Sequence, residues 1–477
     1  MRPLRNGERR TPNAEPVSGP SLMPPVESAS VPGLARLALP LAASTGLGFF
    51  LHYVNRTVLS WHSPEALAAS LPAGMLAWTF QGFFVISCGY VGVFAAQHSS
   101  AGERREAGAM VWPMLLLAAL ASLVSVALIL LRQPMAAVFG TEAVVERGLA
   151  ELLGWYLAEL GPMAIASGIA GFCGGIGRTR LVLVMSVCGA VVCMALNRWL
   201  VLGGLGVPAL GITGAGLATL GTAVLMCAAW LVWLFAPAQR RDYATWAGRN
   251  RDPVRFLRYC RYALPRGATE ILEMVAFVAF TAVLTRLGTD ALSASNLAFN
   301  TYLLLMVPVI GFSQGISIAV GQAIGAGVPD QARQAVRSAF LILGPYVLIV
   351  AGAFALIPHL LLLPAHHGDD ALWARQMVLA VPVMLMLAVA MPFEAAHWIW
   401  RSAVQGAGDT RWPLVALVLG ATCLLALPAW LLHGSMEPGL PGLRLCYGLF
   451  ILYVAFIAVA MGWRYRRGAW AGMSVRG

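Results

Sequence analysis

The sequence predicts an all-α polytopic membrane protein with about twelve transmembrane helices in two pseudo-symmetric six-helix lobes. Three observations support this fold class. The chain is 59% hydrophobic and 11% charged, with a mean hydropathy of +0.75. It contains about twelve apolar runs, and its two halves resemble each other along most of their length.

The composition indicates that lipid surrounds most of this chain. Soluble domains are typically about 45–50% apolar, which is well below the value found here. A helix that crosses a bilayer needs about 20 mainly apolar residues. The apolar runs cover approximately 33–58, 67–97, 108–131, 149–172, 181–202, 211–236, 260–285, 292–325, 338–363, 375–402, 412–433 and 442–463. Little chain therefore remains for a soluble domain.

The net charge of +11 indicates membrane topology. The arginines lie in short loops and tails instead of on one face of a folded module, which argues against a nucleic-acid partner. By the positive-inside rule, the side with most arginines is cytoplasmic and carries both termini. We thus expect a multi-pass protein of the inner or plasma membrane. The arginines that follow the even-numbered runs include Arg104, Arg105, Arg178, Arg180, Arg240, Arg241, Arg333, Arg337, Arg411 and Arg464.

The segments outside the apolar runs are short. Residues 1–32 are rich in Pro, Ser and Arg, which predicts a disordered cytoplasmic tail and no signal peptide. We expect residues 237–259 to be a cytoplasmic linker and residues 464–477 a cytoplasmic tail. The eight cysteines lie in or beside apolar runs, where they act as small hydrophobic residues. Their spacing indicates neither a disulfide framework nor a metal site.

An internal repeat divides the apolar part into lobes at 33–236 and 260–463. Pro40 aligns with Pro265, 225 positions later, and Gln97 aligns with Gln322 at the same offset. Farther along, the offset is 231. There Gly175, Gly177, Thr179 and Arg180 align with Gly406, Gly408, Thr410 and Arg411.

The number of runs in each lobe predicts how the lobes are related. Six spans is an even number, so both lobes start on the same side of the membrane. Their symmetry axis should then lie along the membrane normal, with a cleft between lobes that rock against each other. The alternative is a duplication that serves structure only.

Several segments together resemble the multidrug and toxic compound extrusion (MATE) family, over nearly all of residues 33–463. Their order and spacing carry the resemblance, because single Gly/Ala-rich strings recur in membrane helices. The segments are Leu37-Ala38-Leu39-Pro40, Glu65-Ala66-Leu67-Ala68-Ala69, Gly321-Gln322-Ala323-Ile324-Gly325-Ala326-Gly327, Asn197 followed by Pro208-Ala209-Leu210-Gly211-Ile212-Thr213-Gly214-Ala215-Gly216-Leu217-Ala218-Thr219, and Gly406-Ala407-Gly408-Asp409-Thr410-Arg411.

The resemblance implies a secondary antiporter that exports small amphipathic or cationic organic compounds in exchange for H⁺ or Na⁺. It implies alternating access of two lobes, no cofactor beyond the coupling ion, and a monomer in the bilayer. The closest alternative is a flippase for a lipid-linked precursor, which would favour a strongly basic cleft and extra helices. A receptor or scaffold would not need buried carboxylates. An enzyme is not expected, because His52, His98 and His397 lack the spacing of a metal or nucleophile site.

Two acidic residues lie inside apolar runs of the second lobe. A charged group at the bilayer centre costs about 2.5–3.5 kcal/mol, so such residues usually have a function or a partner. Glu273 lies roughly 20 Å along its helix from the start of the run, near mid-bilayer. Glu394 follows Pro392, which frees a backbone carbonyl one turn earlier. These acids predict a site for H⁺ or Na⁺, or alternatively ion pairs with nearby arginines such as Arg266.

The family resemblance points to the same two acids. Glu273 falls on the family's second-lobe cation-site glutamate, and Glu394 on its helix-ten aspartate. Phe277 falls on a family aromatic residue one turn after Glu273. Glu270 and His397 would support the site or serve structure alone.

The first lobe departs from the family pattern. Asn55 and Val201 occupy the places of two family aspartates, while Asn197 remains. An amide cannot exchange a proton near neutral pH, so ion coupling is expected in the second lobe. Glu159 is either functional or structural.

Four residues in the second and eighth spans are candidates for lining the cleft, although residues of these types more often pack in a core. They are Trp78, Gln81, Tyr302 and Met306.

Overall fold

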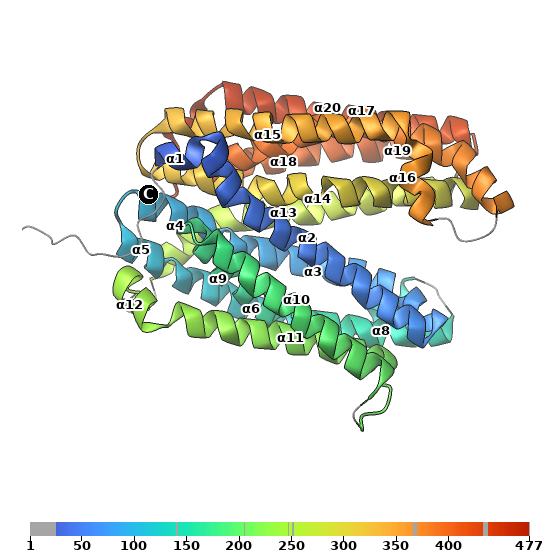
Figure 1. Cartoon of the computed structure of the whole chain (residues 1–477), viewed down its shortest axis with the longest axis horizontal. Coiled ribbons are helices and arrows are strands. Elements are labelled where there is room, and N and C mark those ends of the chain that lie inside the picture. Colours follow the sequence, from blue (N-terminus) through green and yellow to red (C-terminus); the bar gives the residue numbers. More distant parts are fainter. Residues whose placement is uncertain are drawn as a thin grey trace, which may run out of the picture.

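The structure is a bundle of long, roughly parallel helices (Figure 1). This computed structural model describes residues 25–476, except 140–141, 205, 247, 250–251, 366–369 and 433–436. Among the described residues, eleven helices are long and apolar enough to cross a membrane. The prediction of an all-α polytopic membrane protein is confirmed.

The first lobe contains α2 to α11. Its elements are α2 (Val31–His62), α3 (Pro64–Gly89), α4 (Val91–Ser100), α5 (Arg104–Ala109), α6 (Val111–Leu130), α7 (Arg132–Ala137), α8 (Ala143–Ala158), α9 (Leu160–Gly175), α10 (Thr179–Leu202) and α11 (Gly211–Leu234). The pairs α3–α4, α5–α6 and α8–α9 each form one membrane span.

The second lobe contains α13 to α20, and α12 (Pro237–Tyr243) precedes it. Its elements are α13 (Pro253–Thr285), α14 (Thr289–Gly325), α15 (Pro329–Leu356), α16 (Pro358–Leu362), α17 (Asp370–Ala407), α18 (Arg411–Gly420), α19 (Leu427–Leu432) and α20 (Leu440–Arg466). The predicted run 412–433 is interrupted, because a π-helical turn (Ala421–Ala426) separates α18 from α19. Pro428, just after this turn, has no N–H to continue an α-helical ladder.

Local signals explain where several helices begin and end. Ser63 caps α3 by accepting a hydrogen bond from the Ala66 amide at 3.0 Å. The turns that follow α4, α9, α14 and α17 each require a positive φ, which glycine adopts without strain. The four turn glycines are two repeat pairs, Gly102 with Gly327 and Gly177 with Gly408, and their φ angles are 82°, 75°, 82° and 111°.

Two predicted tails are partly ordered. Residues 1–24 of the predicted tail 1–32 lie outside the described residues, but residues 25–29 form α1 (Pro25–Ala29). This helix packs on α15, where the Ser338 hydroxyl donates to the carbonyl of Ala29 at 2.8 Å. The predicted tail 464–477 also packs, and Trp470 and Val475 are fully buried. Hydrogen bonds and a few buried side chains thus hold parts of both segments against the bundle.

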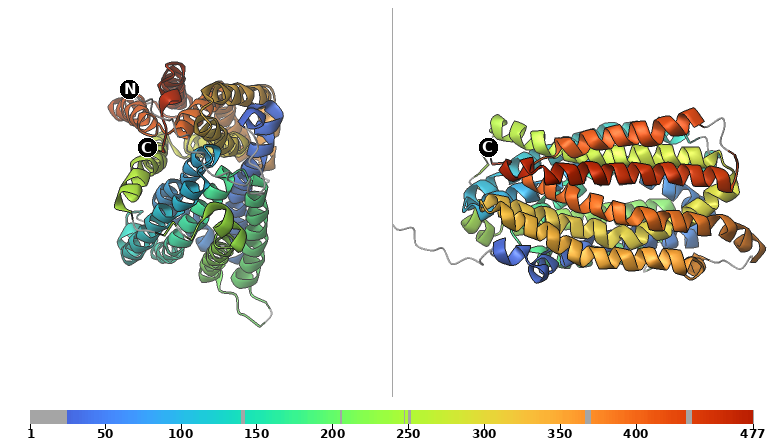
Figure 2. Two further views of the ribbon diagram at one scale, coloured as in Figure 1. Left: turned by 90° about the vertical axis from the view of Figure 1, so that its left-hand side faces the viewer. Right: turned by 90° about the horizontal axis from the view of Figure 1, so that it is seen from above.

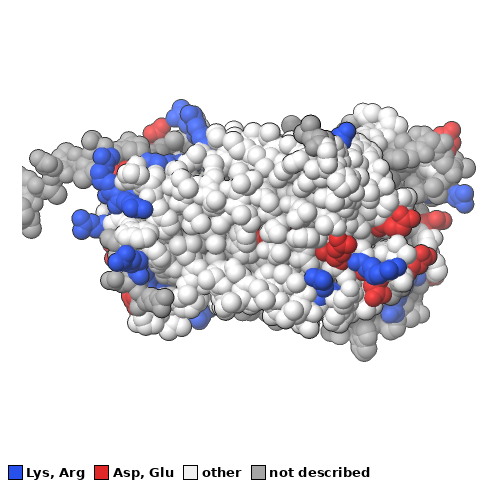
Figure 3. Space-filling view, turned by 90° about the horizontal axis from the view of Figure 1, so that it is seen from below, with Lys and Arg blue, Asp and Glu red and all other residues white. Residues whose placement is uncertain are grey.

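The two lobes lie side by side, and α2 crosses obliquely between them (Figures 1 and 2). Charged side chains gather at the two ends of the bundle, while the face in Figure 3 carries very few in the belt between them. This distribution suits a bilayer around the belt. We call the end that carries α1 and the C-terminal segment, residues 468–476, the terminal end (Figure 1).

Reciprocal contacts between the lobes follow the internal repeat. Helix α2 packs on α14, and its repeat counterpart α13 packs on α3. The Gln97 amide donates to the Gly406 carbonyl at 3.1 Å. Its counterpart Gln322 donates to Gly175, the counterpart of Gly406, at 3.4 Å. A two-fold rotation between parallel lobes produces such paired contacts.

Candidate functional site

The predicted second-lobe acids lie in a partly buried charged cluster formed by side chains of α13 and α17. On α13, residues 266, 269, 270 and 273 share one helix face because they are spaced three or four positions apart. The Arg266 guanidinium donates to Thr269 Oγ1 at 2.9 Å and to Glu270 Oε1 at 2.7 Å. Glu273 forms an ion pair with Arg401 of α17.

Arg401 connects the two helices and was not among the site residues predicted from the sequence. It is 1% exposed. Besides its pair with Glu273, it donates to Thr269 Oγ1 at 3.0 Å and lies 3.5 Å from Glu270 Oε1. Its guanidinium also lies over the Trp398 ring, 4.8 Å from the centroid. A basic residue at the end of the apolar run 375–402, seven positions after Glu394, was the signal that could have identified it.

Glu394 joins this cluster through Trp398. The Trp398 indole N–H donates to Glu394 Oε1 at 2.9 Å. His397 Nδ1 lies 3.9 Å from Glu394 Oε2, too far for a hydrogen bond. Both ring nitrogens of His397 are buried without a hydrogen-bond partner among the described residues. Phe277 stacks on Phe299, with ring centroids 5.0 Å apart, and so contributes to packing.

The charges of the cluster do not cancel. Three carboxylates, on Glu270, Glu273 and Glu394, face two guanidinium groups, on Arg266 and Arg401. Glu273 forms the kind of arginine pair that was the alternative reading of the acids, with Arg401 as its partner, whereas Glu394 forms none in the described part of the chain. The arginine pairs of Glu273 and Glu270 are the ones present. They leave one carboxylate in excess in the ionised cluster, so a single monovalent cation or proton would neutralise it.

The first lobe has a polar cluster of its own. The Asn197 amide donates to Asn55 Oδ1 at 2.6 Å, and both residues are buried. Glu159, at the break between α8 and α9, is 9% exposed. The Gln81 amide donates to the Tyr156 carbonyl at 2.6 Å and lies 3.3 Å from Glu159 Oε1. Within the described part of the chain, Glu159 has no arginine or lysine within salt-bridge distance. The first lobe thus keeps one buried carboxylate, although the two family aspartates are absent.

The four candidate cleft residues have different environments. Tyr302 and Met306 are 3% and 2% exposed and belong to the main hydrophobic core. Gln81 is also buried, whereas Trp78 is half-buried and lies so close to Gly82 that a Cβ added there would be 3.3 Å from its ring. In this conformation Tyr302 and Met306 therefore pack in the core and do not line open space.

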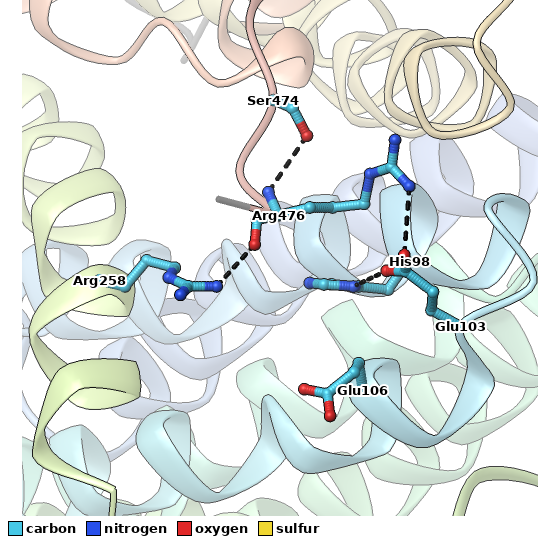
Figure 4. A pocket seen from close by; sticks show the side chains of 6 residues that line it. All are labelled: His98, Glu103, Glu106, Arg258, Ser474 and Arg476. Carbon is cyan, nitrogen blue, oxygen red and sulfur yellow. Dashed lines mark hydrogen bonds and ion pairs between the residues drawn. The ribbon is translucent and has the colours of Figure 1, made fainter.

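A separate cavity of about 490 Å³ lies at the terminal end (Figure 4). There Arg258 of the second lobe donates to the Arg476 carbonyl at 2.6 Å, and Arg476 lies 3.5 Å from Glu103 of the first lobe. The C-terminal segment therefore contacts both lobes. The cavity is lined by His98, Glu103, Glu106, Arg258, Ser474 and Arg476.

Comparison with protein families gives two matches to one family. The sequence model of the MatE family matches residues 40–199 and 265–431, which together make up more than half of the chain. The matches begin at Pro40 and Pro265, the residues that the internal repeat superposes. One family model therefore describes both halves.

Curated relatives match along almost their whole length. The chain is 29% identical over 457 residues to "Multidrug resistance protein NorM" of Burkholderia vietnamiensis, covering 93% of this chain and 95% of the relative. It is 28% identical over 449 residues to "Probable multidrug resistance protein NorM" of Pseudomonas syringae pv. tomato, covering 91% and 95%.

Solved structures share the fold at lower identity. A MOP superfamily transporter from Pyrococcus furiosus, described as having a binding pocket of reverse polarity, superposes with a TM-score of 0.81 at 18% identity. The superposition covers 94% of this chain and 99% of that one. An outward-facing multidrug resistance MATE family transporter gives a TM-score of 0.80 at 18% identity, covering 94% and 97%. These likenesses support the fold.

Proposed function

Because this chain belongs to the MatE family of membrane transporters, we propose that it exports small amphipathic or cationic organic compounds in exchange for H⁺ or Na⁺. Its relatives named as multidrug resistance proteins match it over nearly the full length, which supports this substrate class. Their names give no support to the alternative of a lipid-precursor flippase.

The excess carboxylate in the α13–α17 cluster is the observation that carries the coupling part of the proposal. Glu273 and Glu394 would take up H⁺ or Na⁺ as the lobes alternate between two open states. One charge that moves through 100 mV provides about 2.3 kcal/mol, enough to concentrate a substrate more than tenfold. A single ion per cycle is therefore sufficient for export.

Membrane orientation and oligomeric state complete the proposal. The terminal end carries α5 and α12, which contain Arg104, Arg105, Arg240 and Arg241 (Figure 1). By the positive-inside rule this end faces the cytoplasm of an inner or plasma membrane. The protein would act as a monomer, since each chain contains both lobes.

Drug accumulation in everted membrane vesicles tests this function. Vesicles that contain the protein receive either a proton gradient or a sodium gradient, together with a fluorescent organic cation. Uptake that depends on one of the gradients is expected, and vesicles without the protein are the control. Transport with neither gradient, or none with any amphipathic compound, would contradict the proposal.

Asn55→Ala tests the location of coupling in the second lobe. The substitution removes the acceptor of the 2.6 Å hydrogen bond from Asn197, which costs roughly 1–3 kcal/mol of stability. Because neither amide titrates, the dependence of transport on the ion gradient should stay unchanged. The measurement is uptake at a series of gradient magnitudes in vesicles that contain equal amounts of folded protein.

Loss of the gradient dependence in Asn55→Ala would place coupling in the first lobe. Glu159 would then be the titratable group, and Glu159→Gln should reproduce the loss. Gradient-dependent transport in both variants would keep coupling in the second lobe.

Glu394→Gln should reduce gradient-driven transport severalfold without abolishing it. The acid contributes charge to the cluster, but its hydrogen bond comes from Trp398 and not from an arginine. The glutamine carbonyl can still accept that bond. Initial uptake rates for Glu394→Gln and wild type, at matched protein content, measure the effect. A wild-type rate would remove Glu394 from the coupling site.

A further inference from the structure

The environment of Arg401 is unusual for a membrane-embedded arginine. The side chain is buried, and its guanidinium contacts Glu273, Glu270 and Thr269 of another helix. Its Nε atom is buried without a partner in the described part of the chain. Arginine remains charged in proteins, so this positive charge is permanent.

The positive charge of Arg401 is paired with Glu273, the carboxylate that binds the coupling ion in the proposed function. Glu273 Oε1 pairs with a guanidinium nitrogen of Arg401. A Na⁺ ion that binds this oxygen, or a proton that neutralises it, has to weaken the same ion pair. Ion and guanidinium therefore compete for one carboxylate.

We propose that Arg401 is the internal counter-cation of the second-lobe carboxylates, which holds Glu273 until the coupling ion displaces it. This inference rests on the proposed function. It gives Arg401 a positioning role in ion exchange and sets the stoichiometry at one monovalent cation for each cluster.

The remaining contacts of Arg401 provide a place for the displaced guanidinium. It already lies 3.5 Å from Glu270 and 4.8 Å from the centre of the Trp398 ring. An aromatic face stabilises a guanidinium by a cation–π interaction. Trp398 also donates to Glu394, so a shift of Arg401 across this ring affects the hydrogen bond of the third carboxylate. The ion-free and ion-bound arrangements thus differ in contacts between α13 and α17.

Competition makes ion binding dependent on conformation. An ion shifts an equilibrium between two states only if it binds them with different affinity. A state in which α13 and α17 separate weakens the Arg401–Glu273 pair and frees the carboxylate. Other titratable or charged groups near the pair are Arg266 and Glu270 on α13, Glu394 and His397 on α17 and Tyr453 on α20. Tyr302 on α14 lies near Glu394.

The test is ion-dependent thermal stability of the purified full-length protein in detergent. A ligand that binds the folded state raises the melting temperature with its concentration. Melting is followed during titration with NaCl, against choline chloride at equal ionic strength, and separately during titration with acid. The midpoint of each titration reports the affinity for Na⁺ or H⁺.

Arg401→Gln should move the midpoint to a lower ion concentration by about tenfold or more, the effect expected for removal of an opposite charge in contact. Arg401→Lys keeps the positive charge but lacks the planar guanidinium with its two parallel N–H donors. The midpoint of the ion titration should then return toward the wild-type value. The double variant Arg401→Gln/Glu273→Gln lacks the competing pair altogether, so it should fold and should not reproduce the lowered midpoint of Arg401→Gln. An unchanged midpoint in Arg401→Gln, with stability alone reduced, would overturn the proposal.

Two further variants keep the outcomes separable. If Arg401→Gln does not fold, Thr269→Val removes an acceptor of Arg401 without altering charge, and a smaller decrease of the midpoint in the same direction is expected. An unchanged midpoint in Thr269→Val would then contradict the proposed competition between Arg401 and the ion for Glu273. A wild-type midpoint in Glu273→Gln would instead contradict the proposed coupling site itself.

Discussion

Glu273→Gln is expected to reduce gradient-driven efflux to background. Glutamine keeps the size and much of the hydrogen-bonding capacity of the side chain but removes its charge. The variant therefore lacks the group whose ion binding would bias the lobes toward one state. Efflux of a fluorescent organic cation from proteoliposomes, driven by a proton or a sodium gradient, measures the effect.

The Arg401 contact changes the expected stability of this variant. An isolated buried carboxylate could be neutralised at little cost, but here Arg401 loses one of its three partners on α13. Because Arg401 keeps Glu270 and Thr269, the loss should be roughly 1–3 kcal/mol. Folded protein is thus expected, which allows transport to be measured.

Glu65→Gln is the matched control for this experiment. Glu65 is exposed at the start of α3, so the same substitution should leave transport and stability nearly unchanged. Wild-type efflux in Glu273→Gln would show that coupling does not depend on this carboxylate.

Gly171→Val should give the largest loss of stability. Helix α9 approaches α3 and α4 through glycines. A Cβ added at Gly171 would collide with the carbonyl group of Gly89 and would lie 3.2 Å from the Gly89 Cα. A Cβ on Gly92 would in turn lie 2.7 Å from the Gly171 carbonyl oxygen. Backbone atoms cannot move aside as a flexible side chain can, so the cost should reach about 3 kcal/mol or more. Monodisperse protein recovered in detergent, and its melting temperature, are the measurements.

Gly352→Val in α15 provides the comparison. A Cβ at Gly352 meets nothing within 4 Å, so the same added side chain should be tolerated. Equal yields and melting temperatures of the two variants would show that the α9 contact is looser than the structure indicates.

The sequence predicted the fold well because its signals are local or repeated. Apolar runs give the spans directly, since hydrocarbon permits few alternatives to a helix. The pairing of Gln97 with Gln322 and of Gly175 with Gly406 came from the repeat alone. The structure then places each glutamine against the glycine of the other half.

The contents of the site were harder to predict. Glu273 and Glu394 stand out because a charged residue in an apolar run is rare. The two runs do not indicate which other helix contacts each acid. Arg401 lies 128 positions from Glu273, so their contact depends on the tertiary arrangement that brings these two side chains of α13 and α17 together. Likewise, Glu159 is buried beside Gln81 because α3 packs on α8, a contact that periodicity does not specify.

The C-terminal segment breaks the symmetry of the two halves. Gln97 Oε1 accepts hydrogen bonds from the Val475 amide at 3.0 Å and the Ser474 hydroxyl at 3.1 Å. The same oxygen of Gln322 is buried without a partner among the described residues. A rotation that opens the terminal end must therefore break contacts that have no equivalent in the other half. If the lobes rock as proposed, the two directions differ in energy even for halves that superpose well, and the difference originates in a few residues outside the repeat.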